Sequence, residues 1–320
     1  MRIKKTYFYT GLAIAAIILA GIFYYFNSSK HVPVKNEAQP ENGQANDGWN
    51  VDGNGYLSYP GYRGEVKFRR DNYSETETLH ISKIVYQSEN GNIYGLLVIP
   101  KTVSGALPGV VLLPGAGVSK ESELYLAEKI SSLGAAVLTI DQRGVGETDG
   151  KVSSIDDDYK SFINGQEPFQ HLMVYDALRG YDFISSAPFV DKGRIIIAGE
   201  SLGGRIAIIA AAIDTNIHGV LVISSAGFGF AGGNDVLKNR FVNSIDSDHY
   251  TPLISPRRLV MIHAINDTKI SFSSAVNTFI KAQEPKQFVV INDTSCKHGY
   301  CDSMESAIVS SMEYLAGLKN

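Results

Sequence analysis

A serine lies in a glycine-flanked corner near the middle of the chain. Ser201 is part of the segment GESLGG, with Gly199 and Gly203 two residues to either side. A serine hydroxyl is a poor nucleophile until a base removes its proton, and a sharp strand-to-helix turn presents it to a carbonyl carbon. Such a turn crowds the backbone and therefore needs glycine on both sides. The pattern predicts that Ser201 attacks an acyl group.

The residues around this corner support the prediction. RIIIA precedes it as a short apolar run typical of a buried strand, and RIAIIAAAI follows it as an apolar helix. The N-terminus of that helix would direct backbone N–H groups and the positive end of its dipole at an oxyanion. The five-residue pattern is weak by itself, but the strand–turn–helix setting is the one that this chemistry requires.

A general base should come late in the chain if the three groups follow the order serine, acid, histidine. Of the seven histidines, His298 lies beyond the last expected strand, in the loop NDTSCKHGYCDS. Loops at the carboxyl ends of strands often carry catalytic side chains. His263 lies inside the apolar run LVMIHAI, where a packed core histidine is expected. We therefore predict that His298 is the base.

An acidic side chain is needed to orient the imidazole ring. Asp267 comes just past the expected strand RRLVMIHAI, and an ordinary turn aspartate is the alternative interpretation. Its predicted role is to fix the tautomer of His298 and to stabilise the imidazolium. Asp246 and Asp248 are the reserve candidates.

An oxyanion hole needs two backbone N–H groups. The first is predicted to belong to Leu202, directly after Ser201. The second should come from LLPGAGVSKE, which follows an apolar strand, opens a helix and has glycines that let a substrate approach the backbone. Ala116 is the predicted donor, and Gly115 is the alternative.

The elements that must position these groups alternate along the chain. LHISKIVYQ and IYGLLVIP flank SENGN, in which Asn90-Gly91 favours a hairpin turn. From GVVLLPGAG onward, fully apolar strands alternate with helices. This order predicts an α/β domain over residues 51–320, with a mostly parallel central sheet and helices on both faces. Residues 227–250 interrupt the alternation and are expected to form a short cap over the edge where ligands bind.

Residues 1–28 are expected to form a transmembrane helix. No charged side chain occurs from Tyr7 to Phe26, and aromatic residues gather at both ends of this run. Twenty helical residues rise about 30 Å, the thickness of a bilayer core. Basic residues before the run predict a cytoplasmic N-terminus and an extracytoplasmic domain. A cleaved signal peptide, and hence a secreted domain, is the alternative. Residues 29–50 are expected to form a polar flexible linker.

Composition excludes several classes of function. The chain has 320 residues, 44% of them hydrophobic, and a net charge of −4, which gives no electrostatic basis for binding nucleic acid. Its two cysteines, Cys296 and Cys301, are too few for a disulfide scaffold and lack the partners of a zinc site. A local disulfide between them is expected in an extracytoplasmic domain, and two free thiols are the alternative.

A glycine-rich segment could be mistaken for a cofactor site. GFGFAGG matches Gly-x-Gly-x-x-Gly at Gly227, Gly229 and Gly232. A dinucleotide site would need a long helix next and an acidic residue at the end of a second strand, whereas NDVLKNRF is short and Asp246 lies outside any expected strand. No P-loop or His-Glu-x-x-His motif occurs either. We therefore expect neither a cofactor nor a metal.

The chain from Leu79 to Leu318 resembles the α/β-hydrolase family, in particular its dienelactone-hydrolase and acetyl-esterase-like members. The resemblance rests on GESLGG, DQRGVGET, HAINDTKI and KHGY. In such relatives the loop after the third strand often contains His-Gly, whereas this chain has Pro114-Gly115. Asp141 and Arg143 in DQRGVGET are expected to tie loops together rather than to act in catalysis.

These observations predict a membrane-anchored serine hydrolase that acts on a small-molecule ester. Ser201 would form an acyl-enzyme that water then hydrolyses. A carboxylic ester is favoured because the resemblance is closer to esterases, and the short cap favours a small or exposed acyl group. A peptidase or amidase of the same fold is the second interpretation, and a non-catalytic binding module on this scaffold is the third. The sequence makes no prediction of oligomeric state.

Overall fold

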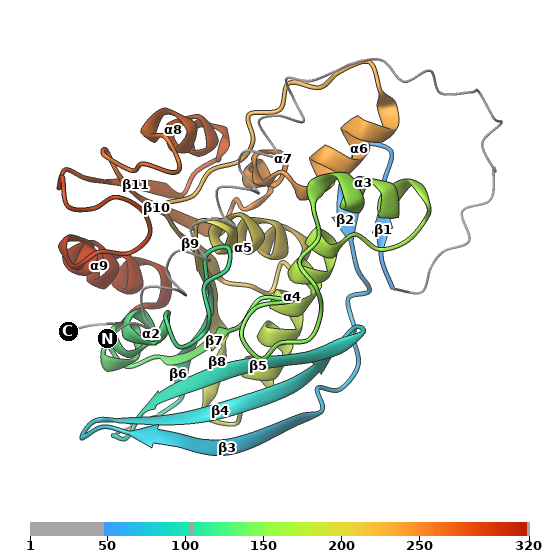
Figure 1. Cartoon of the computed structure of the whole chain (residues 1–320). Coiled ribbons are helices and arrows are strands. Elements are labelled where there is room, and N and C mark those ends of the chain that lie inside the picture. Colours follow the sequence, from blue (N-terminus) through green and yellow to red (C-terminus); the bar gives the residue numbers. More distant parts are fainter. Residues whose placement is uncertain (1–47, 103–104, 319–320) are drawn as a thin grey trace, which may run out of the picture.

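A computed structural model describes residues 48–102 and 105–318 (Figure 1). Over these residues the centre of the fold is a nine-stranded sheet with the order β11-β10-β9-β8-β6-β7-β5-β4-β3. The strands are β3 (Phe68–Glu75), β4 (Leu79–Ser88), β5 (Gly91–Pro100), β6 (Leu107–Leu113), β7 (Ala136–Ile140), β8 (Val190–Glu200), β9 (Gly219–Ile223), β10 (Arg258–Ala264) and β11 (Lys286–Ile291). Strands β6 to β11 pair in parallel, and β3, β4 and β5 form an antiparallel end. The predicted mostly parallel sheet is confirmed.

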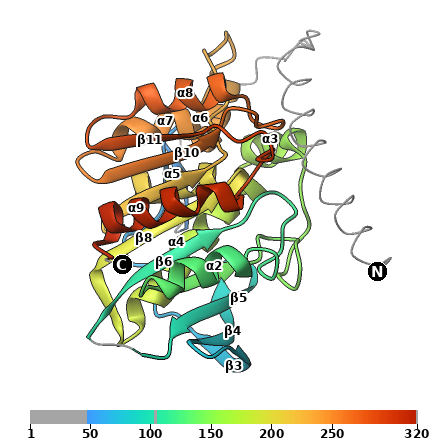
Figure 2. The same cartoon turned by 90° about the vertical axis from the view of Figure 1, so that its left-hand side faces the viewer.

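Helices cover both faces of the sheet, as the fully apolar strands predicted. Strand β6 shows why: Val110 and Leu112 pack in one core, and Val111 and Leu113 pack in the other. Because side chains alternate along a strand, a run of apolar residues must be buried on both sides. Helices α2 (Leu124–Ser132) and α9 (Glu305–Ala316) cover the face nearer the viewer in Figure 2. Helices α4 (Phe169–Ser186), α5 (Leu202–Ile213) and α8 (Phe272–Lys281) cover the other.

The predicted hairpin is present, and a further strand beside it was not predicted. Strands β4 and β5 pair from Leu79–Pro100 to Ser88–Gly91, and Asn90 in the turn has φ of 56°. Strand β3 adds FRRDNYSE to the outer edge, with all eight residues exposed. A strand without apolar alternation gives no periodic signal, since its pairing with β4 depends on backbone hydrogen bonds.

The segment predicted to form a cap packs against a helix that was not predicted. Residues 227–250 contain α6 (Val236–Ile245) and the short α7 (Ser247–Tyr250). Helix α3 (Ile155–Ile163) packs against α6, because the rings of Tyr159 and Phe162 contact Phe241 (Figure 1). Ser154 caps α3 by accepting the Asp157 N–H at 3.1 Å. Residues 227–250 therefore pack as one unit with α3.

The N-terminal part of the described chain also packs against this cap. Strands β1 (Asn50–Val51) and β2 (Leu57–Ser58) form a small antiparallel pair. The Trp49 ring contacts Phe162 and His171. Trp49, which the sequence analysis placed within the linker, is thus part of the packed domain. The expected transmembrane helix over residues 1–28 lies outside the described residues, and no helix within residues 48–102 and 105–318 is long and apolar enough to cross a membrane.

The buried histidine His171 should make the stability of the protein depend on pH. His171 is fully buried, bonds to the Ser244 hydroxyl at 2.7 Å, and has a pKa that burial lowers to about 3. In the unfolded chain its pKa is about 6.5. The contribution of His171 to the free energy of unfolding is therefore fully present above pH 6.5. It is lost as the pH falls, because the unfolded chain binds a proton that the folded chain excludes. At pH 5 the free energy of unfolding should be about 2 kcal/mol lower from this group alone.

Urea unfolding at pH 7 and pH 5 measures this loss. We expect His171→Gln, whose amide can keep the bond to Ser244, to lose about 2 kcal/mol less than the wild type between the two pH values. His218→Gln, at an exposed position, is the control. Identical losses in the wild type and His171→Gln would show that His171 does not carry this pH dependence.

Candidate active site

Ser201 lies at the corner between β8 and α5 in a strained backbone conformation. Its φ of 50° and ψ of −115° fall outside the regions that non-glycine residues favour, at a cost of about 1–3 kcal/mol. Two hydrogen bonds hold it there: the Ser201 N–H donates to the Ile223 carbonyl at 2.9 Å, and the Ser225 hydroxyl donates to the Ser201 carbonyl at 2.6 Å. Strain of this kind is maintained where the surrounding structure fixes it, which is typical of functional sites.

The two flanking glycines are required by close backbone packing. A Cβ atom on Gly199 would lie 2.3 Å from the carbonyl carbon of Gly203. A Cβ atom on Gly203 would lie 2.1 Å from the carbonyl oxygen of Leu113, at the end of β6. Neither contact can be relieved by rotating a side chain, because both involve backbone atoms. The turn therefore has the crowding that the sequence analysis expected around Ser201.

The structure brings Asp267 and His298 together across 31 positions of sequence. Nδ1 of His298 lies 2.9 Å from Oδ2 and 3.0 Å from Oδ1 of Asp267. The carboxylate also accepts the backbone N–H groups of Lys269 at 2.8 Å and Ile270 at 2.9 Å. Burial alone would raise the pKa of Asp267, but the bonds from His298 and Ile270 lower it below its usual value. The carboxylate is thus ionised and aimed at the imidazole.

The loop that carries His298 is fixed against the end of β8. The Thr268 N–H donates to the Lys297 carbonyl at 2.7 Å, and the Ser224 hydroxyl donates to the Gly299 carbonyl at 3.3 Å. The Tyr300 N–H donates to Oε2 of Glu200 at 3.1 Å. Because Glu200 directly precedes Ser201, these bonds place the His298 loop beside the serine corner.

A disulfide between Cys296 and Cys301 spans His298, with the two Cα atoms 5.7 Å apart. The expected local bridge is therefore present. A bridge that closes so short a loop stabilises the fold by about 2 kcal/mol, which leaves the chain folded when it is lost. If His298 is the base, a displacement of its loop by about 1 Å could lower the rate by about 100-fold. We expect reduction to lower kcat by about 10-fold or more while the free energy of unfolding falls by about 2 kcal/mol.

Cys296→Ser/Cys301→Ser tests this expectation without a reductant. Turnover of p-nitrophenyl acetate and urea unfolding are measured on the same preparation. Equal turnover with and without the bridge would show that hydrogen bonds alone position His298.

His263 is buried in the core, as predicted, but it also lies beside the acid. Its side chain is 1% exposed, and its Nε2 lies 3.0 Å from the Ile270 carbonyl and 3.8 Å from Oδ2 of Asp267. Burial lowers the pKa of His263, which favours the neutral ring. The contact of His263 with Asp267 was not predicted. The sequence does not indicate whether side chains four residues apart meet where a strand ends in a turn.

The reserve acids Asp246 and Asp248 have structural partners in the cap. Oδ1 of Asp246 accepts the Phe228 N–H at 2.9 Å, and Oδ2 of Asp248 accepts the Gly229 N–H at 3.0 Å and the Lys281 ammonium at 2.7 Å. A Cβ atom on Gly227 would lie 2.2 Å from the Asp248 carboxyl carbon. Gly227 thus makes room for two carboxylates, and these acids hold this loop rather than orient His298.

The loop after β6 lies against the serine corner. A Cβ atom on Gly115 would lie 3.6 Å from the Cβ of Ser201, so this glycine allows close approach. The Gly115 N–H donates to the Glu123 carboxylate, and the Pro114 carbonyl accepts from the Gln142 amide at 2.6 Å. Because Gly115 is committed to Glu123, Ala116 is the better candidate for the second oxyanion donor. Leu202 opens α5, where backbone N–H groups have no intrahelical partner.

The DQRGVGET segment ties loops together, as expected. Asp141 accepts the backbone N–H of Lys120 at 2.7 Å, the ammonium of Lys120 at 2.8 Å and the N–H of Glu147 at 3.0 Å. Arg143 donates to Asp176 in α4 at 2.8 Å. These bonds fix the loops after β6 and β7 and give both side chains a structural role.

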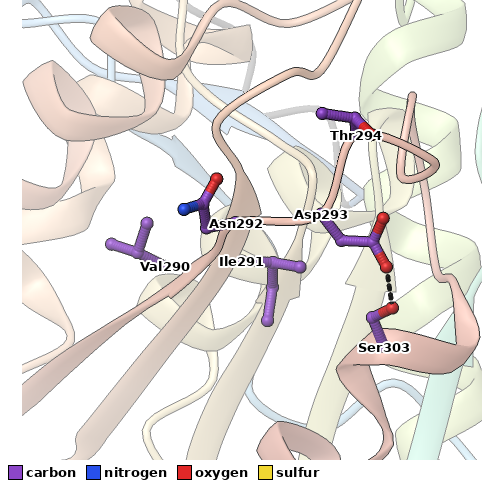
Figure 3. Close-up of a pocket in the computed structure, with 6 residues that line it drawn as sticks. All are labelled: Val290, Ile291, Asn292, Asp293, Thr294 and Ser303. Atoms are coloured by element: carbon purple, nitrogen blue, oxygen red, sulfur yellow. Dashed lines mark hydrogen bonds between the residues drawn. The ribbon is translucent and has the colours of Figure 1, made fainter.

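An open depression lies where β11 ends and the loop toward His298 begins (Figure 3). It has a volume of about 530 Å³, and its lining residues are Val290, Ile291, Asn292, Asp293, Thr294 and Ser303. The Ser303 hydroxyl bonds to Oδ2 of Asp293, and this bond and those from Ser295 lower the pKa of Asp293 to about 2. The depression is therefore bordered by the hydrogen bonds that Asp293 makes with Ser295 and Ser303, which we call the outer brace of the loop. It contains no residue of the serine corner.

Four further residues around Ser201 were not selected from the sequence. Ser224 and Ser225 support the His298 loop and the serine carbonyl, and Glu123 and Glu200 bond to the backbone of the two neighbouring loops. Glu200 could have been selected from the sequence, because it directly precedes Ser201. The other three come from separate elements, so only the folded chain brings them together.

The sheet order, the strand–turn–helix corner and the bonded Asp267–His298 pair define the chain as a protein of the α/β-hydrolase fold. The family model described as acetyl xylan esterase (AXE1) matches residues 62–225, just over half of the chain. The chain belongs to this family.

Individual relatives agree with this placement. A Bacillus subtilis (strain 168) protein named as a putative hydrolase, YtaP, is 30% identical over 165 residues, which are 48% of this chain and 52% of the relative. The chain thus matches about half the length of this curated relative. An acetyl xylan esterase from Paenibacillus sp. R4 has a TM-score of 0.66 at 21% identity, over 78% of this chain and 88% of that one. A second, from Thermoanaerobacterium sp. JW/SL YS485, has a TM-score of 0.62 at 15% identity, over 80% and 89%.

Proposed function

We propose that the chain is a serine esterase that removes a short acyl group, such as acetyl, through an acyl-enzyme on Ser201. The observation that carries this proposal is the hydrogen-bonded pair of His298 and the buried carboxylate Asp267 on a loop that is fixed beside the strained Ser201 corner. The family match and the names of the similar solved structures support an ester as substrate.

The proposed reaction follows from the roles of these groups. His298 takes the Ser201 proton as Oγ attacks the ester carbon, and the N–H groups of Leu202 and Ala116 stabilise the oxyanion. Asp267 holds Nδ1 of His298 protonated, so that the other ring nitrogen is free to act as the base. The imidazolium gives its proton to the leaving alcohol, and water, activated in the same way, releases the acid and restores Ser201.

We further propose that residues 1–28 anchor the chain in a membrane and that the hydrolase domain lies on the extracytoplasmic side. The uncharged run from Tyr7 to Phe26 and the basic residues before it support the anchor. The disulfide between Cys296 and Cys301 supports an oxidising compartment. Protease added to intact cells should cleave the domain from its anchor, whereas protection until lysis would place the domain inside.

A fluorophosphonate probe tests the proposed nucleophile in the full-length chain. We expect covalent labelling in the wild type, with the adduct located by mass spectrometry on the peptide that contains Ser201. Parallel assays compare p-nitrophenyl acetate, butyrate and octanoate with an acetyl anilide. Hydrolysis should be fastest for the acetate, faster cleavage of the anilide would indicate an amidase, and a folded wild type that neither labels nor turns over would indicate a binding module.

A further inference from the structure

Two carboxyl groups, one buried and one half-buried, lie beside the proposed nucleophile and have no part in the reaction described above. Glu200 is the last residue of β8 and directly precedes Ser201. Glu123 directly precedes α2, and only 4% of its surface is exposed. The two groups interact electrostatically, because the charge of Glu200 contributes to the raised pKa of Glu123. Burying two acidic groups side by side is unfavourable, so their retention calls for a reason.

Each carboxyl group bonds to the backbone of a different loop. Glu123 accepts the N–H of Gly115, one residue before the proposed oxyanion donor Ala116. Glu200 accepts the N–H of Tyr300, two residues after His298, at 3.1 Å. A Cβ atom on Gly299 would lie 2.7 Å from Oε2 of Glu200, so this loop passes directly over the carboxylate. The two groups therefore connect the oxyanion loop, the serine corner and the base loop.

The surroundings give the two groups different protonation states. Burial, reinforced by the negative charge of Glu200, raises the pKa of Glu123 well above its usual value. Burial also raises the pKa of Glu200, but only to about 6, because the Tyr300 N–H and the charge of His298 oppose it. As the pH rises, Glu200 therefore loses its proton before Glu123 does. Positive charge on the nearby imidazole is stabilised by the Glu200 carboxylate.

We propose that Glu123 and Glu200 are a positioning pair that holds the oxyanion and base loops against Ser201. This inference rests on the proposed esterase function. Neither side chain touches the substrate in this arrangement. The pair acts through the Gly115 and Tyr300 backbone and through the field of Glu200 at His298.

Glutamine variants in the full-length chain separate the two roles. An amide resembles a protonated carboxyl group and can still accept the Gly115 N–H, so Glu123→Gln should keep kcat/KM within about 3-fold of the wild type. Glu123→Ala, which cannot accept that bond, should lower kcat/KM by about 10-fold. Glu200→Gln removes the charge and should lower kcat by about 10- to 100-fold with little change in KM. Glu313→Gln, exposed on α9, is the matched control.

The pH profile adds a readout that a purely structural role would not change. In the wild type, log kcat/KM should show an inflection near pH 6, because protonation of Glu200 removes the charge that stabilises the imidazolium. This inflection should be absent in Glu200→Gln and present in Glu123→Gln. An acid limb in Glu200→Gln identical to that of the wild type would overturn the proposal.

A readout independent of turnover distinguishes failure of this proposal from failure of the esterase function. The Tyr300 amide proton resonance should titrate with a midpoint near pH 6 in the wild type, through its bond to Glu200, and should not titrate in Glu200→Gln. A folded wild type without esterase activity but with this titration would reject the function and keep the pair. A wild type that turns over ester but shows no such titration would reject the pair and keep the function.

Discussion

Replacing His298 by Ala should lower kcat by about 10⁶-fold, nearly as much as replacing Ser201 by Ala. The reason is that the two groups act as one unit: without the base, the serine hydroxyl keeps its proton and is not a nucleophile. The double variant should consequently be no slower than either single variant, because each change already removes the whole effect. The residual rate above that of water would come from the oxyanion donors and from substrate binding.

Steady-state kinetics with p-nitrophenyl acetate measures this non-additivity. His218→Ala, at an exposed position, is the control and should retain wild-type kcat. A double variant measurably slower than both single variants would mean that Ser201 and His298 act independently. That outcome would remove the basis for an acyl-enzyme on Ser201.

The order of chemical groups was predictable because each leaves a local mark on the sequence. The Ser201 corner is marked by glycines that the close approach of β6, β8 and α5 requires, and these contacts are present. The strands β6, β7 and β9 are marked by continuous apolar residues, since both of their faces are buried. Asp267 and His298 were selected by their places after successive strands, and topology then brings the ends of β10 and β11 together.

Features that depend on non-local contact left no such mark. Strand β3 is fully exposed, so its sequence lacks the alternation that indicates a half-buried strand. Helix α3 has a clear N-cap at Ser154, but its role in the cap depends on ring contacts with α6, which lies much later in the chain. The pair of Glu123 and Glu200 depends in the same way on two loops that meet only in the folded chain.

Replacing Asp267 by Asn should lower kcat by about 10⁴-fold with little change in KM. The carbonyl oxygen of the new side-chain amide can still accept the N–H groups of Lys269 and Ile270, which now bond to the carboxylate. The amide NH₂ would then face Nδ1 of His298, which must accept that bond and so lose its proton. The ring proton moves to Nε2, and the nitrogen required to deprotonate Ser201 is no longer free. The variant therefore keeps the geometry of the site but holds His298 in the tautomer that cannot act as the base.

Burst kinetics separates this effect from a loss of binding. Acylation and deacylation should both slow in Asp267→Asn, because His298 acts as the base in each step. Asp293→Asn is the matched control: its carboxylate bonds to Ser295 and Ser303 in the outer brace, so kcat should change by less than about 3-fold. If Asp267→Asn kept kcat within about 10-fold, His298 would have to be oriented by other groups, and the buried ring of His263 beside Asp267 would be the first to examine.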